Sequence, residues 1–400
     1  MKRAAPGFVV AAMLVLAVPR GLAQVTAGPG AQRSEAMRLE QAGRNAEAEA
    51  LWKRLLSTNP ADAEAYAHLG ILEARSERYK PAIAYYRKAL ALQPDMPGVQ
   101  LNLGLSLFKA GDFRDAIRTF QPLLKTASGG SPEQARLVTL IGLAHYGLGQ
   151  YTQAVPYLKK ATAYDKQNLP FRLALAQSCL WSRQYQCVLD VYHEILLLNA
   201  ESAEADMLAG EAYDAMKNSA GAIEQFRAAV KADPRMPNAH FGLGYLLWTQ
   251  NQFEEASSEF RAELENVPSN AKAMVYLADS EMQLNHPDVA LPLIQRAIRL
   301  DPSLARAHLD LGILYTDARR HQEALKELQI AVKLSPQDPN VHWRLARLYQ
   351  AMGRKQEAQV EFKRTQELHK LADETVFKQL KKAQEMGKEG GGATVRAPKP

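Results

Sequence analysis

A period of 34 residues runs along almost the whole chain and limits what it can fold into. Residue pairs that end in glycine or alanine recur at this spacing, with a single longer step of 38 residues. The pairs are Leu69-Gly70, Leu103-Gly104, Ile141-Gly142, Leu175-Ala176, Ala209-Gly210, Leu243-Gly244, Leu277-Ala278, Leu311-Gly312 and Leu345-Ala346. A unit of 34 residues is too short to bury a core alone, so the period predicts an array of small units that stack on one another.

Further positions keep the same period. Twelve residues after Gly70 stands the small residue Ala82, and four residues later stands the ring of Tyr86. The other units repeat this order of a small residue and then a ring or bulky apolar residue, and proline often closes the unit, as at Pro94. We number each unit so that Gly70 and its equivalents occupy place 8, which puts Ala82 at place 20.

The recurrent glycine predicts two helices in close contact. A glycine inside a helix costs about 1 kcal/mol relative to alanine, so its repeated use at one place implies a compensating gain. We expect each unit to be a hairpin of a helix A and a helix B, in which a side chain at place 8 would collide with the small residue at place 20. The fold class predicted is therefore all-α: an α-solenoid whose concave face is lined by the A helices.

The order small, small, aromatic, proline is similar to that of the tetratricopeptide repeat. The resemblance covers residues 29–370, or ten units, including a degenerate first unit that carries Ala36, Ala48, Trp52 and Pro60. It implies an interaction scaffold that holds a partner in the concave groove. It does not imply an enzyme, and we find no Gly-x-Ser-x-Gly, phosphate-loop or dinucleotide motif.

Both ends of the chain depart from the repeat. Lys2 and Arg3 precede an apolar run of eleven residues, Phe8 to Val18, and small residues precede Gln24, which together resemble a secretory signal over 1–23. The run is shorter than the roughly twenty residues that span a bilayer, so we expect cleavage near Ala23, no integral membrane span afterwards, and a periplasmic or secreted protein. At the other end we expect a capping helix over 371–386 and a flexible tail over 387–400. The 38-residue step contains Thr126–Pro132, which predicts a longer loop between units three and four.

Charge argues against a nucleic acid as partner. The net charge of +6 comes from the two ends, because residues 24–369 hold equal numbers of basic and acidic residues. A balanced body lacks the concentrated basic face that phosphate backbones require.

Histidine and cysteine give no metal or cofactor site. His240, His308 and His342 all occupy place 4 of helix A, which favours packing between repeats. His193-Glu194 lacks the second histidine of a zinc-protease motif, because position 197 is leucine. Cys179 and Cys187 lie near the turn of the fifth hairpin, so a disulfide and two buried free thiols both remain open.

The groove is the candidate functional site. Places 2, 5, 9 and 12 of helix A form one stripe, which in this family faces the concave surface. The candidate partner-groove residues on it are Leu101, Leu105, Phe108, Leu143, Tyr146, Phe241, Tyr245, Trp248, Leu309, Ile313 and Trp343. Their apolar character favours a protein or peptide segment with aliphatic or aromatic anchors, held by an envelope adaptor. The alternative function is an accessory subunit for polysaccharide synthesis or export, with a glycan in the groove.

Overall fold

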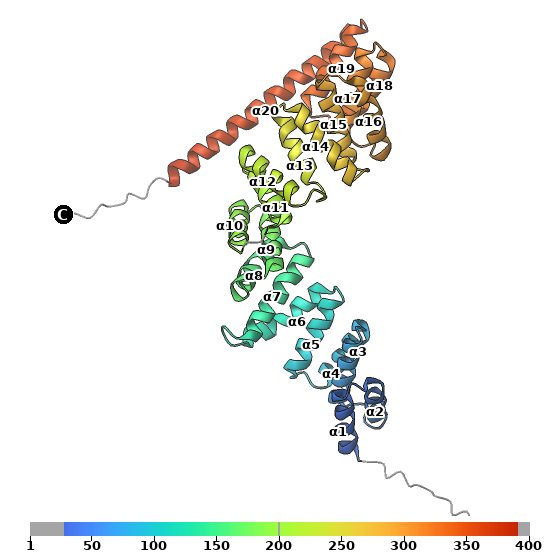
Figure 1. Ribbon diagram of the computed structural model, residues 1–400, viewed down its shortest axis with the longest axis vertical. Coiled ribbons are helices and arrows are strands. Elements are labelled where there is room, and N and C mark those ends of the chain that lie inside the picture. The colour runs from blue at the N-terminus through green and yellow to red at the C-terminus, as the bar shows by residue number, and fades with distance from the viewer. Residues whose placement is uncertain (1–27, 199–200, 391–400) are drawn as a thin grey trace, which may run out of the picture. The chain divides into compact units, whose positions relative to one another are not determined.

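The chain is an all-helical array of hairpins, as the period predicts. The computed structural model describes residues 28–198 and 201–390, with side chains described as far as Glu374. These residues form twenty α-helices and no strand (Figure 1).

Consecutive helices alternate as the A helix and the B helix of the ten repeats. The A helices are α1 (Pro29–Gln41), α3 (Ala63–Arg75), α5 (Pro97–Lys109), α7 (Pro132–Gly147), α9 (Leu169–Trp181), α11 (Ala203–Ala215), α13 (Ala239–Thr249), α15 (Ala271–Gln283), α17 (Ala305–Asp317) and α19 (Pro339–Ala351). The B helices are α2 (Asn45–Thr58), α4 (Tyr79–Leu92), α6 (Phe113–Thr126), α8 (Tyr151–Tyr164), α10 (Tyr185–Leu197), α12 (Ser219–Ala232), α14 (Phe253–Asn266), α16 (Pro287–Leu300), α18 (His321–Leu334) and α20 (Lys355–Gly390).

The helices belong to two compact units, α1–α7 and α8–α20, which are separated between Leu148 and Gly149. In the first unit, α3 packs against its hairpin partner α4 and against the next A helix, α5. The second unit repeats this arrangement, with α13 against α14 and α15. Because helices inside each unit contact both their partner and a neighbouring repeat, the apolar stripe that one hairpin cannot bury alone is covered by the next.

The turn from helix A to helix B has the same backbone in every repeat. Place 15 has a positive φ, whether it is occupied by glycine, as at Gly111 (82°), or by a larger residue, as at Arg319 (57°). In the second repeat the N–H of Glu77 donates to Ala74 O (3.0 Å) and the N–H of Arg78 donates to Glu73 O (2.9 Å). This pair of bonds satisfies the last carbonyls of helix A and reverses the chain sharply.

Place 8 is confined by a ring, which corrects the expected contact with place 20. A Cβ built on Gly104 would lie 2.3 Å from Phe120 Cε1, and one on Gly70 would lie 2.5 Å from Tyr86 Cε1. The neighbour is therefore the aromatic residue at place 24. Place 20 is small for its own reason, since Ala82 and Ala116 are fully buried in the hairpin.

The 38-residue step lengthens a helix more than a loop. Five residues separate α6 from α7, where four separate α4 from α5, and α7 has 16 residues where α5 has 13. Ser131 accepts a hydrogen bond from the N–H of Gln134, and Pro132 occupies the first turn, so helix α7 begins early. The expected long loop is thus mostly an extra helical turn.

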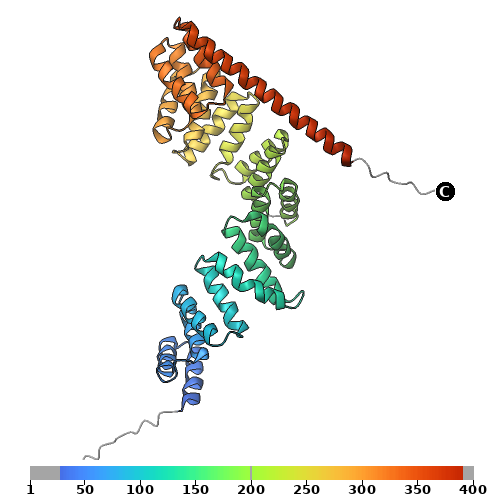
Figure 2. The same ribbon diagram turned by 180° about the vertical axis from the view of Figure 1, so that it is seen from behind.

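The expected capping helix over 371–386 is not a separate element. Helix α20 runs without a break from Lys355 to Gly390 (Figure 2). Helix B of the tenth repeat therefore extends through residues 371–386. The sequence between Lys355 and Met386 contains neither glycine nor proline to end the helix. Residues 387–390, expected in the tail, are helical, whereas 391–400 and the signal-like segment 1–23 lie outside the described residues. None of the described helices combines the length and the apolar composition needed to cross a bilayer.

Candidate partner-binding groove

Four aromatic rings on helices α13 and α15 form a half-buried surface, here called the aromatic strip: Phe241, Tyr245, Trp248 and Tyr276. Along α13 the rings of Phe241 and Tyr245 stack at 6.4 Å, and those of Tyr245 and Trp248 at 6.0 Å. Tyr276 meets Tyr245 edge-on at 5.3 Å and Trp248 at 5.1 Å. These geometries are favourable for aromatic pairs, so the strip is a preformed surface and not a set of mobile side chains.

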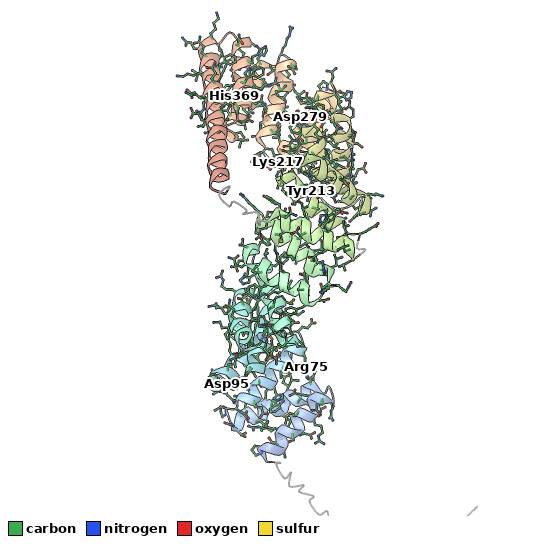
Figure 3. All side chains as sticks on the ribbon, turned by 90° about the vertical axis from the view of Figure 1, so that its left-hand side faces the viewer. Arg75, Asp95, Tyr213, Lys217, Asp279 and His369 are labelled. Atoms are coloured by element: carbon green, nitrogen blue, oxygen red, sulfur yellow. A yellow bond between two sulfur atoms is a disulfide. The ribbon has the colours of Figure 1, made fainter. Side chains whose placement is uncertain are left out.

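Polar groups fix one end of the strip. The indole N–H of Trp248 donates to Asp279 Oδ2 at 2.6 Å, and Arg306 forms an ion pair with the same oxygen at 2.8 Å. The guanidinium of Arg306 also lies 5.2 Å from the centre of the Trp248 ring, within the range of a cation–π contact. Asp279 is buried among the helices of the second unit (Figure 3). The orientation of Trp248 is therefore set by bonds to two neighbouring repeats.

A second buried carboxylate lies beneath this end. Arg306 Nε donates to Asp310 Oδ1 at 3.1 Å, and Asp310 is 1% exposed. Burial raises the pKa of Asp310 to about 8, the charge of Asp279 acts in the same direction, and Arg306 opposes both. A proton on Asp310 leaves the Asp279–Arg306–Asp310 network, as we call it, electrically neutral, which suits a dry site.

Three adjoining pockets border the strip. The first pocket, of about 530 Å³, is lined by Phe241 and Tyr245 together with residues of α9 and α11. The second, of about 300 Å³, shares both rings and adds Tyr276 and Arg306, and the third, of about 310 Å³, lies against Trp248 and Arg306. The shared residues make one continuous lined surface along α9 to α17. Pockets of this size with aromatic walls and a few polar groups are typical of ligand sites.

The other groove residues divide into three groups. Leu309 is 2% exposed and packs with Val341 and Leu345 of α19, so the expectation that it faces a partner is wrong. The half-buried residues are Leu101, Leu105, Phe108, Leu143, Tyr146 and Ile313. Trp343 is 39% exposed and borders a smaller pocket, of about 210 Å³, with Ile313 and the side chains of Arg344 and Arg347.

Three residues of the groove were not predicted from the sequence. Tyr276 lies at place 6, off the predicted stripe, yet its ring touches the other three rings of the strip. Asp279 is on the stripe, at place 9 of the eighth repeat, and holds Trp248. Trp181, at place 13, is 63% exposed and lines the first pocket. The sequence signal that could have identified Tyr276 is an aromatic residue at place 6 in the repeat that follows the aromatic-rich helix α13.

The histidines at place 4 are structural. In the seventh repeat His240 Nδ1 lies 2.6 Å from Glu259 Oε2, and Nε2 lies 3.1 Å from Pro234 O at the end of the sixth repeat. His308 and His342 repeat both contacts with the equivalent glutamate and proline. Each ring thus connects helix A to helix B and to the preceding repeat, which is how the sequence pattern was interpreted. No group of three or more histidine, cysteine or acidic side chains in the described residues could hold a metal ion.

Cys179 and Cys187 are joined in the structure. Their sulfurs are 2.07 Å apart and their Cα atoms 5.8 Å apart, so the bridge links the end of α9 to the start of α10. Of the two readings left open by the sequence, the structure contains the disulfide.

Comparison with known proteins identifies the repeat. A tetratricopeptide repeat family model matches residues 33–97, 101–180, 207–271 and 275–339, and a second model of the same repeat matches 315–374. Among curated proteins, the Protein CTR9 homolog of Arabidopsis thaliana is 22% identical over 66% of this chain and 25% of its own length. BBSome complex member BBS4 of Bos taurus is 23% identical over 70% of this chain and 53% of its own length. The chain therefore spans between a quarter and about half of these relatives.

Among solved structures, the APC/C hetero-tetramer Cut9–Hcn1 is similar, with 12% identity and a TM-score of 0.42 over 86% of this chain and 87% of that chain. A crystal structure of MamA is 21% identical, with a TM-score of 0.36 over 41% of this chain and 96% of that chain. The repeat models cover more than half of the sequence, and the ten helical hairpins occur at their spacing. The chain belongs to the tetratricopeptide repeat family.

Proposed function

We propose that this chain is a non-catalytic scaffold of the cell envelope that holds a segment of a partner protein against the aromatic strip. Tetratricopeptide repeat proteins generally bind protein or peptide partners, which gives the class of function. The observation that carries the proposal is the strip itself: four packed rings that keep part of their surface open and border three adjoining pockets.

Rigid aromatic anchors suit this role. A partner that binds a preformed surface loses little conformational entropy in the receptor, and aromatic residues commonly dominate the energy of such interfaces. Trp248 is held by Asp279, and Tyr245 is stacked on both sides, so neither ring has to be ordered when a partner arrives.

Two features support the envelope as the compartment. The signal-like sequence over 1–23 is typical of exported proteins. The disulfide between Cys179 and Cys187 is the kind of bond that persists outside the reducing cytosol.

Photo-crosslinking from the edge of the groove tests the proposal. We would replace Trp181 by a photo-reactive phenylalanine derivative in the full chain, since this exposed side chain borders the first pocket and lies outside the repeat cores. Irradiated cells should give a discrete protein adduct. A probe at Val360, which is similarly exposed (65%) but lies on α20, should not give that adduct.

A cavity-filling variant supplies the specificity control. Ala215 is exposed and lines the first pocket, so Ala215→Trp should block the pocket without removing a packing contact. The adduct should disappear in this variant while the melting temperature stays the same. Crosslinking to a polysaccharide instead of a protein would favour the accessory-subunit alternative, and identical adducts from the blocked variant would contradict a role for this groove.

A further inference from the structure

We propose that the first pocket receives a basic side chain of the partner, a lysine or arginine flanked by aliphatic or aromatic residues. This inference rests on the proposed function and deepens it by naming the chemistry of the bound segment.

The pocket has an apolar wall and an acidic wall. Trp181 of α9 and the rings of Phe241 and Tyr245 on α13 supply the apolar side. Glu211 and Asp214 of α11 supply the acidic side, and they stand three residues apart, on one face of that helix. A volume of about 530 Å³ accommodates a long side chain together with the apolar residues next to it.

Neither carboxylate has an ion-pair partner in the part of the chain that the structure describes. Among the described residues no lysine, arginine or histidine lies within ion-pair distance of Glu211 or Asp214, although many other acids of the chain are paired, such as Glu255 with Arg227 (2.9 Å). Arg183 also lines the pocket but makes no ion pair with either acid. The pocket therefore presents two acids and one base, with a net negative charge.

The surroundings of Glu211 disfavour its charged form when no cation is near. Loss of water raises the pKa of Glu211, and the nearby charge of Asp214 raises it further. A cation that enters the pocket relieves both effects, because it returns an opposite charge to a carboxylate that water no longer solvates fully. The same cation can lie on the face of an aromatic ring, which adds a cation–π contact.

The pocket beside Trp343 has the opposite net charge, because its lining holds two arginines and one acid, Asp317. Trp343, on α19, has the guanidinium groups of Arg344 and Arg347 at 5.1 and 5.7 Å from its ring centre. A basic side chain is repelled there and attracted to α11. This difference selects the first pocket for the basic residue and gives a bound segment a direction along the groove.

Selection from a random peptide library tests the inference. Peptides displayed on phage would be selected for binding to the immobilised full chain. Peptides that also bind the Ala215→Trp variant, in which the first pocket is blocked, would be removed. We expect the enriched sequences to share a lysine or arginine within two residues of an aliphatic or aromatic residue. One enriched peptide would then be synthesised with and without its basic residue, the latter as glutamine, and titrated by fluorescence anisotropy.

The variants separate charge recognition from general binding. The double variant Glu211→Gln with Asp214→Asn should weaken binding of the basic peptide by about tenfold or more, as expected for a charge-assisted contact. Its affinity for the glutamine peptide should stay the same. Glu224→Gln, which removes an exposed acid from helix B of the same repeat, should change nothing. Enriched peptides without a base, or equal affinity in the double variant, would overturn the inference while leaving the proposed function standing.

Two further outcomes distinguish other occupants. If no peptide binds the unmodified chain better than the Ala215→Trp variant, the result would count against the proposed function as well. The chain's own residues 391–400 contain the basic residues Arg396 and Lys399, which could occupy the first pocket in place of a partner. A shortened chain that ends at Gly390 tests this. Peptide binding that becomes at least tenfold tighter in that shortened chain would identify the tail as the occupant and overturn the assignment to a partner.

Discussion

Glu77, Lys217 and Arg319 carry long side chains at a backbone conformation that usually requires glycine. All three occupy place 15, where the chain must reverse between helix A and helix B, and all three are exposed. The conformation is imposed by the hairpin and not by the residue, because Gly111 and Gly353 adopt it at the same place. Each larger residue there lowers the stability of its turn without affecting the fold.

Arg319→Gly should therefore stabilise the protein. Removing the Cβ relieves about 1 to 2 kcal/mol of left-handed strain, part of which is lost to the greater entropy of glycine in the unfolded chain, for a net gain of about 0.5 to 1 kcal/mol. Thermal unfolding followed by circular dichroism measures the gain. Lys326→Gly, inside helix α18 of the same repeat, should instead cost about 1 kcal/mol, and a loss in both variants would contradict the strain.

Place 8 offers a second comparison within one helix. Gly104→Ala puts a methyl group 2.3 Å from the Phe120 ring and should destabilise the chain by about 1 to 3 kcal/mol, because the buried ring must move. Gly98→Ala, in the first turn of the same helix, meets nothing within 4 Å and should be neutral or slightly stabilising. Equal midpoints in urea for the two variants would show that the hairpin tolerates the added methyl.

Helices α13 and α17 show what the stripe could and could not predict. Both carry an apolar residue at place 5, yet Phe241 stays half-buried while Leu309 is covered by α19. The period identifies which residues share a face of one helix, and this much was predicted correctly. Whether the next A helix covers that face depends on the size of side chains in two repeats at once, which a pattern read along one helix does not contain. Tyr276 was missed for the same reason.

The Asp279–Arg306–Asp310 network links three places on two A helices and makes the stability of this region depend on pH. The pKa of Asp310 is about 8 in the folded chain, against an ordinary value of 3.8. A carboxyl with a raised pKa binds more protons in the folded state than in the unfolded state, so it favours folding at low pH, and this contribution is lost as the pH rises to about 8. Asp279, Arg306 and Arg344 are the charged groups that face it.

Asp310→Asn should flatten this dependence, because the amide stays neutral at every pH. Urea unfolding at pH 6 and pH 8.5 should show a smaller fall in stability for the variant than for the unmodified chain. The exposed Asp317 lies on the same helix, and Asp317→Asn should keep the original slope. An unchanged slope in Asp310→Asn would mean that the carboxyl is ionised throughout.

For the molecule as a whole, the period predicted the fold class and the number of hairpins, since both follow from counting units. Boundaries were less predictable. The capping helix merged with α20 because the sequence offers no residue that ends the helix, and the extra residues before α7 became a helical turn because Ser131 and Pro132 start it early. The division between Leu148 and Gly149 falls inside the fourth repeat and has no counterpart in the repeat pattern.

Export is the expectation that belongs to the whole chain. If 1–23 is a cleaved signal, mass spectrometry of the protein from a periplasmic extract should find an N-terminus at or within a few residues of Gln24. Replacing Leu14 and Leu16 in the apolar run by arginine should leave the chain unprocessed in the cytosol. Recovery of Met1 in the membrane fraction would instead indicate an uncleaved anchor.

The left-handed turns also provide a set of equivalent labelling sites. Place 15 is exposed in every repeat, from Gly43 to Gly353, and its backbone is the same each time. A spin label at Lys217 can therefore be moved to Asn285 or Arg319 and stay on the same local backbone. Differences in signal between the labelled positions would then arise from contact with the partner and not from the label's own backbone. The repeats to which a bound segment lies close can therefore be mapped one by one.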